Sequence, residues 1–447
     1  MREKSTKGTK KNPIGREEMI TREENDLLTR TGPGTPCGEL FRRYWQPVAL
    51  AEELPPGGPP LPVKLMGEEL VLFRDEEGRP GFLDLHCPHR GADLSYGRLE
   101  DGGIRCIYHG WLFDRRGRCL DQPGEPGGGK QKESTRLKAY PCQEQAGIIF
   151  GYLGPGEPPL LPNYEILTVA AEQRFVCKVF SECNYLQGNE GNIDPIHLSF
   201  LHRIMDEGLA VGSRPSQYQR VRGSEGAPSQ WLGANVAPTI DVDLTDFGLR
   251  ISTWRPVGDQ AYLRVSNFVL PNLCAVPGET QGAGYLVNWH VPVDDERHWK
   301  YMIVFSREAP LDKEKFSQRY RAEIGPDYRP IRNSSNRYLQ DRQEMKSLTF
   351  MGLGSFFPDH DLCATEGEGP IQDRTQEHLT SSDKAVVAAR KLLLKAMKDV
   401  QEGREAPHVV RSPDSNRFPH MVVLSEVVPN VTDWKEYTKK AEVRALL

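Results

Sequence analysis

The sequence predicts an α+β protein built from two folded domains. Short strand-like segments bounded by turn residues fill residues 47–154 and recur between residues 174 and 305, which is typical of antiparallel sheets. One long helix with an apolar stripe is predicted over residues 380–400. With 447 residues, the chain is long enough for each domain to bury its own core. We therefore expect a small antiparallel β domain followed by an antiparallel sheet flanked by helices.

The segment before the first domain divides into two parts. Residues 1–18 are polar and lysine-rich, so little apolar burial offsets the entropy of ordering them, and a disordered tail is expected. Residues 19–46 contain two short helical patterns, over residues 23–28 and 38–44, which are expected to lead into the β domain.

Residues 47–154 are predicted to form the small β domain. Apolar segments at residues 62–65, 69–73 and 82–85 are separated by turn sequences and indicate hairpins. Further strands are expected before Cys106 and over residues 111–113 and 147–152. These strands would present two loops at one end of the domain.

A proline-rich linker is predicted at residues 155–163. Residues 164–402 are predicted to form the second domain, and Ser382 and Asp383 are expected to cap the long helix near its end. Its expected strands cover residues 174–180, 249–253, 261–269, 285–291 and 300–305. Residues 403–447 follow as a C-terminal extension whose role the sequence does not indicate.

Composition excludes several functional classes. The chain has 57 basic and 62 acidic residues, and this balance gives no sign of a nucleic-acid or membrane-surface partner. No apolar run is long enough to span a membrane and no secretory signal opens the chain, so a cytoplasmic protein is expected. Nine cysteines in a chain of this length do not indicate a disulfide framework.

Two loops of the small domain carry the residues expected to bind a metal cluster. Cys87 and His89 form a Cys-x-His motif, and Cys106 and His109 form a Cys-x-x-His motif. In a Rieske centre two cysteines bind one iron of a [2Fe-2S] cluster and two histidines bind the other, so each loop supplies one ligand of each kind. A tetrahedral Cys2His2 zinc site is the alternative. Zinc fingers keep like ligands together in each pair, so the pattern favours the Rieske cluster.

A second group of candidate ligands lies in the larger domain. Asp194, His197 and His202 fall within nine residues of a chain that has only 11 histidines. Imidazoles and a carboxylate bind Fe(II) on one face and leave positions open to oxygen and substrate. The alternative is a pair of hydrogen-bonded histidines at the buried end of a helix. On a regular helix His197 and His202 would lie about 140° apart, so binding one metal requires the helix to break or widen between them.

These motifs together resemble one family. The chain is similar to the oxygenase (alpha) component of the Rieske non-haem iron aromatic ring-hydroxylating oxygenases. It most resembles the phthalate dioxygenase branch, which includes phenoxybenzoate dioxygenases and aryl-ether O-demethylases. The resemblance also implies a helix-grip type of sheet in the catalytic domain. It rests on the two cluster loops and on residues 31–35, 42–45, 184–202, 369–374 and 377–379.

The resemblance implies which residues bind iron. Cys87, His89, Cys106 and His109 would hold the cluster, as the motifs already indicate. A mononuclear Fe(II) would be held by His197, His202 and an acid from a later helix. The family places that acid eight residues before a Gly-Pro-Ile sequence, and counting back from Gly369 gives Asp361, with Asp359 as the alternative. The alternative for both acids is that they lie at the solvated start of a helix and bind no metal.

The resemblance also implies an assembly. Family members form head-to-tail homotrimers, or multiples of a trimer, in which the cluster of one subunit faces the iron of the next. An aspartate bridges the two sites, and its position in the motif is that of Asp194. It would accept hydrogen bonds from His197 of its own chain and from His109 of a neighbouring copy.

Three polar residues precede Asp194 on the same segment. Asn184, Gln187 and Glu190 are expected either to lie near the iron and orient its ligands or to make ordinary capping and core hydrogen bonds. The sequence favours neither interpretation.

Electrons are expected from a separate NAD(P)H-dependent reductase, because the chain has neither a plant-type C-x4-C-x2-C cluster motif nor a G-x-G-x-x-G dinucleotide motif after a strand. Arg90, Arg98 and Arg105 lie near the cluster loops and are candidates for guiding its docking.

The resemblance implies an oxygenase that uses O2 to hydroxylate, dihydroxylate or O-demethylate an aromatic carboxylate. Arg203, Arg214 and Arg255 are candidates for binding the carboxylate, because guanidinium groups bind carboxylates in bidentate pairs. Two other classes are considered. One is an electron-transfer protein that uses only the Rieske cluster, and the other is a zinc-binding structural module.

Overall fold

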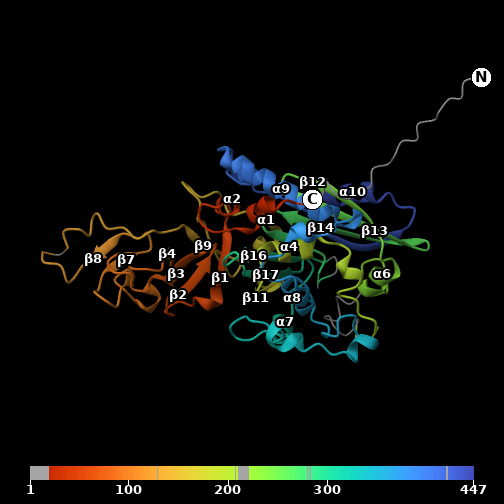
Figure 1. Cartoon of the computed structure of the whole chain (residues 1–447), viewed down its shortest axis with the longest axis horizontal. Helices are drawn as coiled ribbons and strands as arrows, with labels where there is room; N and C mark the ends of the chain where they lie inside the picture. Colours follow the sequence, from red (N-terminus) through yellow and green to blue (C-terminus); the bar gives the residue numbers. More distant parts are fainter. Residues whose placement is uncertain are drawn as a thin grey trace, which may run out of the picture.

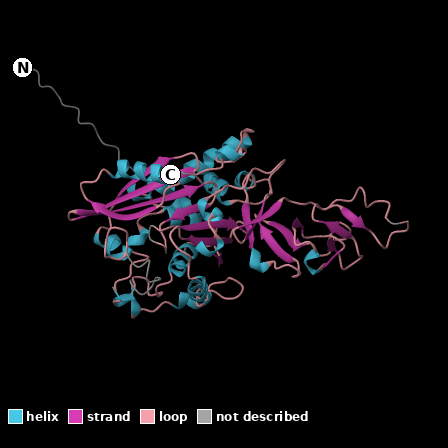
Figure 2. Ribbon diagram, turned by 180° about the vertical axis from the view of Figure 1, so that it is seen from behind, coloured by secondary structure: helices cyan, strands magenta, loops and turns pink. Residues whose placement is uncertain are grey.

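The computed structural model describes residues 20–446 apart from residues 128, 207, 210–220, 279, 281–282 and 419–420. The predicted tail at residues 1–18 and the candidate Arg214 therefore lie outside the described residues. Figure 1 shows an elongated molecule, with the small β domain at one end and the larger domain at the other. Seen from behind in Figure 2, the small domain consists mainly of strands and loops, whereas strands and helices are mixed in the larger one.

Two short helices open the described chain, as predicted. Helix α1 (Arg22–Thr29) begins with a capping box in which Thr21 and Glu24 each bind the other's backbone N–H. Helix α2 (Pro36–Phe41) has proline in its first turn, where the missing N–H costs no hydrogen bond.

The small domain contains three antiparallel sheets. Their orders are β1-β10-β9, β2-β3-β4 and β5-β6-β7-β8. The strands are β1 (Gln46–Leu50), β2 (Leu61–Leu65), β3 (Glu68–Arg74), β4 (Pro80–Asp84), β5 (Arg98–Glu100), β6 (Gly103–Arg105), β7 (Leu112–Asp114), β8 (Cys119–Asp121), β9 (Cys142–Gln145) and β10 (Ile148–Gly151). The predicted hairpins are therefore confirmed, while β1, β5, β8 and β9 were not predicted.

An eight-stranded antiparallel sheet forms the centre of the larger domain. Its order is β11-β17-β16-β15-β14-β13-β12, and β18 pairs with β14. The strands are β11 (Arg174–Ser181), β12 (Thr239–Leu244), β13 (Gly248–Val257), β14 (Gln260–Val269), β15 (Leu273–Val276), β16 (Leu286–Pro292), β17 (His298–Phe305) and β18 (Leu424–Pro429). Strand β18 comes from the segment predicted as an extension, and it pairs with residues 260–265 of β14.

Helices pack around this sheet. Helix α4 (Tyr185–Ile193) contacts β15, β16 and helix α8 (Phe357–Gly367). Helix α9 (Lys384–Gln401), which matches the long predicted helix, contacts α2 and strands β12 and β13. Other α-helices within the described residues are α3 (Glu165–Thr168), α6 (Pro228–Ala234), α7 (Lys313–Arg321) and α10 (Trp434–Leu446). The predicted α+β class, with a β domain and an antiparallel sheet flanked by helices, is confirmed.

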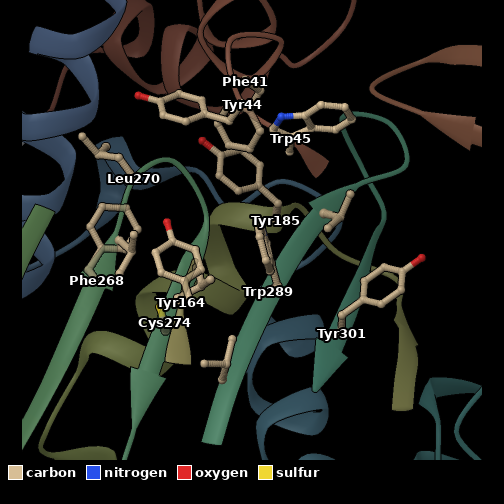
Figure 3. Close-up of a cluster of buried hydrophobic side chains, with 14 of the residues drawn as sticks. Phe41, Tyr44, Trp45, Tyr164, Tyr185, Phe268, Leu270, Cys274, Trp289 and Tyr301 are labelled. Atoms are coloured by element: carbon tan, nitrogen blue, oxygen red, sulfur yellow. The ribbon is translucent and has the colours of Figure 1, made fainter. Parts of the chain in front are cut away.

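One apolar core joins the two domains and the lead-in helices. Figure 3 shows Phe41, Tyr44 and Trp45 beside Tyr185 and Trp289 of the larger domain. The Phe41 and Tyr185 rings meet edge to face with centroids 4.7 Å apart, a geometry that aromatic pairs favour. The two domains therefore pack directly against each other through this core, while the cluster loops pack on a separate core of the small domain. Among the described residues, no helix is long and apolar enough to cross a membrane.

Candidate metal centres

The two cluster loops share one backbone design. Cys87 N–H donates to the Ala92 carbonyl at 2.8 Å, and Cys106 N–H donates to the Trp111 carbonyl at 2.8 Å. In each loop a glycine four residues after the cysteine has positive φ, at 76° for Gly91 and 74° for Gly110, and donates its N–H back to the cysteine carbonyl. These glycines permit the tight turn at little steric cost. The two turns therefore present their cysteine and histidine in matching ways.

The side chains of these loops meet. The rings of His89 and His109 have centroids 4.4 Å apart, and His89 stacks on Trp111 at 4.5 Å. Burial, together with the adjacent Cys106 thiol, raises the pKa of the Cys87 thiol to about 11. The buried Nδ1 of His89 has no hydrogen-bond partner among the described residues. Two adjacent thiols and an unpartnered imidazole nitrogen fit a metal cluster. Bound metal would replace the thiol protons and would give the nitrogen a partner.

A second set of possible ligand atoms comes together between the segment that follows α4 and helix α8. His197, His202 and Asp361 each offer one ligand atom, and these atoms all lie within 4.8 Å of one another. His202 Nε2 is 3.0 Å from Asp361 Oδ1. Neutral imidazoles and a carboxylate in this arrangement fit a single divalent iron.

The chain reaches this arrangement by ending helix α4 early. Asp194 is the C-cap of α4, and Pro195 follows it, which disfavours helical geometry at Asp194. The Asp194 carboxylate accepts hydrogen bonds from Ile196 N–H at 2.7 Å and His197 N–H at 3.1 Å. A short 3₁₀ turn, His197–Ser199, then precedes the turn that holds His202. The predicted break of the helix is therefore present, and no π-bulge occurs in this described segment.

Charges around Asp361 keep it ionised. Burial alone would raise its pKa, but Lys300 and His202 hold the pKa of Asp361 well below its ordinary value. Lys300 Nζ, on β17, lies 3.0 Å from Asp361 Oδ2. Burial lowers the pKa of His202 to about 4, so this imidazole is neutral near pH 7. The site therefore offers a carboxylate and a neutral nitrogen, the protonation states that metal binding needs.

Asp194 lies beside the three converging residues. Its Oδ2 is 3.3 Å from His197 Nδ1. Burial favours the protonated acid, but His197 and two backbone N–H groups hold the pKa of Asp194 below its ordinary value. About a quarter of its side chain, 26%, remains exposed. An ionised carboxylate that contacts His197 and also reaches the surface is able to accept a further hydrogen bond.

The alternative acid, Asp359, lies elsewhere. Its side chain is fully buried, and its Oδ2 is 3.5 Å from Arg332 Nε. It is not one of the three converging residues.

Asn184, Gln187 and Glu190 make structural hydrogen bonds. Asn184 caps α4 and donates to the carbonyls of Thr29 and Asp295. Gln187 Nε2 donates to the Thr365 and Gly369 carbonyls, which ties α4 to the end of α8. Glu190 accepts hydrogen bonds from Arg374 and Arg390 in a buried network. These contacts match the capping and core interpretation of the three residues.

The structure gives the arginine candidates other partners. Arg255 is buried and donates to the Pro195 carbonyl at 2.8 Å, so it holds the turn between Asp194 and His197. Near the cluster, Arg105 forms ion pairs with Glu100, Asp101 and Asp121. Neither Arg255 nor Arg203 is among the described residues that line the cavity beside the metal site.

That cavity opens from His197, His202 and Asp361. Apolar side chains form most of its wall: Leu198, Ile204, Leu232, Val276, Leu286, Met302 and Phe357. Its polar lining includes Asn288, Lys300, Arg264 and the hydroxyl pair of Tyr262 and Ser425, which are 2.8 Å apart. The sequence analysis missed these polar residues. The sequence held one signal for Lys300. It lies on the same strand face as His298 and Met302, within a strand that is otherwise largely apolar.

Comparisons with known proteins agree with this pair of sites. A family model described as Rieske [2Fe-2S] domain matches residues 44–141, and one described as LigXa C-terminal domain like matches residues 151–446. The phthalate 4,5-dioxygenase oxygenase subunit of Pseudomonas putida is 33% identical over 94% of this chain and 95% of its own length.

The chain belongs to the Rieske non-haem iron oxygenases.

Other relatives of this Rieske oxygenase act on different substrates. The 5,5'-dehydrodivanillate O-demethylase oxygenase subunit of Sphingobium sp. is 33% identical, over 89% of this chain and 85% of its own. The tert-butanol monooxygenase / tert-amyl alcohol desaturase oxygenase subunit of Aquincola tertiaricarbonis is 34% identical, over 86% and 78%. The terminal oxygenase of carbazole 1,9a-dioxygenase from Novosphingobium sp. KA1 shares the fold, with a TM-score of 0.56, 21% identity and coverage of 87% of this chain and 99% of its own.

Membership of the family decides the general chemistry. This Rieske oxygenase is the oxygenase component of its system, and it uses a Rieske [2Fe-2S] cluster and a mononuclear iron. Its electrons come from a separate partner protein. The interpretation as an electron-transfer protein alone is not supported.

Proposed function

We propose that this Rieske oxygenase inserts oxygen from O2 into an aromatic carboxylate at an iron held by His197, His202 and Asp361. Hydroxylation, dihydroxylation and oxidative O-demethylation are the candidate reactions. The single observation that carries the proposal is the convergence of these three ligand atoms, within 4.8 Å, at the wall of a mostly apolar cavity. An apolar pocket with a few polar groups is typical of a site for a small organic substrate.

We assign the cluster to Cys87, His89, Cys106 and His109. The matched turns, the adjacent thiols and the contact between the two imidazole rings support this assignment. The cluster supplies an electron, and the mononuclear iron is where dioxygen reacts. The protein's part is to exclude water and to hold the substrate beside the three ligands.

Electron transfer is proposed to cross between neighbouring subunits of a head-to-tail homotrimer or a multiple of one. Strands β7 and β8 of the cluster domain lie at one end of the molecule, well away from helix α8 in the larger domain, which supports a partner chain as the electron source (Figure 1). Asp194 is the proposed bridge, because its ionised carboxylate contacts His197 and remains partly exposed. His109 of the neighbouring copy would donate the second hydrogen bond. The proposed reductant is a separate NAD(P)H-dependent reductase.

The substrate class follows from the cavity and the relatives. Named relatives act on phthalate and on dehydrodivanillate, which are aromatic acids, and the basic side chains of Lys300 and Arg264 line the cavity. A tertiary alcohol is the second candidate, because one relative is named for tert-butanol and most of the wall is apolar.

A substrate panel tests the proposal. Phthalates, phenoxybenzoates, methoxylated benzoates and tert-butanol would each be incubated with the oxygenase, NADH, a surrogate reductase and ¹⁸O2. We expect at least one aromatic acid to yield a product containing ¹⁸O, or to lose its methyl group as formaldehyde. Turnover of tert-butanol without turnover of any aromatic acid would contradict the aromatic assignment.

A further inference from the structure

A third buried histidine lies behind the iron site. His360 precedes Asp361 on α8, and its side chain is fully buried. Its Nδ1 is 3.3 Å from Nδ1 of His202, on the side of that ring away from Asp361. His360 is not itself one of the three converging residues. His360 therefore contacts the proposed ligand His202 and does not itself join the ligand set.

The other ring nitrogen of His360 has a fixed partner. His360 Nε2 lies 3.0 Å from the carbonyl oxygen of Gly354. A carbonyl oxygen only accepts, so this nitrogen carries the proton. Gly354 is held in place in turn, because its N–H donates to Glu344 Oε1 at 2.8 Å.

This contact favours one placement of the protons in the facing rings, although the Leu201 backbone also interacts with His360. If both Nδ1 atoms carried protons, two N–H groups would point at each other. With the His360 proton on Nε2, its Nδ1 is an acceptor, and His202 Nδ1–H donates to it. The proton of His202 is then on Nδ1, which leaves a lone pair on Nε2. That Nε2 is 3.0 Å from Asp361 Oδ1, and because Asp361 is ionised, this tautomer suits the pair when a metal cation is bound between the two atoms.

We propose that His360 is a positioning residue, which holds His202 in the Nδ1–H tautomer so that Nε2 faces the metal. The hydrogen bonds run from His202 to His360 and from His360 to the Gly354 carbonyl. The inference rests on the proposed iron site and adds to it a residue that fixes one ligand. A partner on the far nitrogen of a ligating histidine sets both tautomer and ring orientation.

Packing supports the same role. The His202 ring stacks on Phe357 with centroids 4.6 Å apart and planes 19° apart. The His202 and His360 rings are also close to parallel, at 25°. Phe357 therefore restrains the plane of the ring, while His360 selects which nitrogen bears the proton.

Two substitutions separate the hydrogen bond from the packing. His360→Phe keeps a ring of similar shape but removes the acceptor. His360→Asn places Oδ1 close to the position of Nδ1, so it is able to accept from His202 Nδ1–H. The binding of Fe(II) is measured by competition with a chelator on the cluster-containing full-length protein, with iron counted by elemental analysis.

We expect His360→Phe to weaken Fe(II) binding at the mononuclear site by about 10–100-fold, and His360→Asn to stay within about threefold of the parent. The visible spectrum of the cluster should be unchanged in both, which also reports that the protein is folded. Should the Phe variant not fold, loss of Fe(II) affinity in the folded Asn variant would still overturn the proposal.

Three results would overturn the role of His360. These are an unchanged affinity in the Phe variant, an equal loss in both variants, and a structure of the iron-loaded protein in which a His360 nitrogen lies within about 2.3 Å of the iron. The proposed function fails separately, since in that case the parent protein itself would bind no iron at His197, His202 and Asp361.

Discussion

Lys300 Nζ lies 3.0 Å from Asp361 Oδ2, while the other oxygen of the same carboxylate lies 3.0 Å from His202 Nε2. The lysine side chain is only 6% exposed. A buried cation beside a proposed iron ligand balances the carboxylate when no metal is present. It also occupies one carboxylate oxygen, which favours binding of iron through the other.

Replacing Lys300 tests this balance. In Lys300→Met the buried Asp361 loses its cationic partner, so the metal-free protein should lose about 3 kcal/mol of unfolding free energy. Saturating Fe(II) should recover part of that loss, because iron binds only the folded site. Thermal unfolding with and without Fe(II) measures both effects.

A matched control is Lys395→Met, which removes an exposed cation paired with Asp399 on helix α9, while Arg404 still pairs with that carboxylate. It should change stability by less than about 1 kcal/mol. Equal destabilisation by the two substitutions, or a loss that Fe(II) does not reduce, would mean that Lys300 does not balance the ligand set.

His197→Ala should remove the mononuclear iron and leave the Rieske cluster intact. The imidazole is one of three proposed ligands, while the cluster loops belong to the other domain. Elemental analysis should show one iron fewer for each chain, with the visible spectrum unchanged. Disappearance of the cluster colour together with the iron would argue against two independent sites.

Asp194→Asn should retain both metal sites and slow electron transfer between them. The amide cannot supply the ionised acceptor that the proposed bridge requires, although its oxygen is still able to cap the following N–H groups. We expect the oxidation of the reduced cluster, in a single turnover with substrate bound, to slow by about 10–100-fold. An unchanged rate would exclude Asp194 from the electron path.

Asp359 gives a prediction about pH. Burial, with a smaller contribution from Glu323, raises its pKa from an ordinary 3.8 to about 8. Between these values the folded protein keeps a proton that the unfolded chain releases, so stability falls as pH rises through this range. Asp359→Asn has no such proton and should be more stable than the parent by about 1–3 kcal/mol at pH 8, with little difference near pH 4.

Parallel stability curves for the two proteins across this range would show that Asp359 does not titrate there. Iron content gives an independent control. It should stay the same in Asp359→Asn, because the carboxylate lies beside Arg332 and outside the three converging residues. Loss of iron would instead identify Asp359 as the acidic ligand.

Local sequence was sufficient to predict the cluster loops. Each loop keeps its cysteine and histidine within four residues, and the two loops are neighbours in the sequence. The break between His197 and His202 was predictable for a similar reason, since five residues on a regular helix do not share a face. These features depend on spacing along the chain, which the sequence displays directly.

Other parts of the site depend on contacts between distant segments. Lys300 and His360 reach the proposed ligands from β17 and from the turn of α8 beside Asp361. Ser425 reaches the cavity because β18, about 160 residues after β14, pairs with it. No periodicity within a six-residue strand predicts such a partner. For Arg255 the sequence suggested a substrate contact, whereas the folded chain buries the side chain against the Pro195 carbonyl.

The ratio of iron to acid-labile sulfide in one cluster-containing preparation tests the two-site account most directly. A [2Fe-2S] cluster and a separate iron in each chain predict about three irons for every two sulfides. A ratio near one, in protein that has been saturated with Fe(II) and then freed of excess metal, would contradict the account, because it would leave the cluster as the sole iron site.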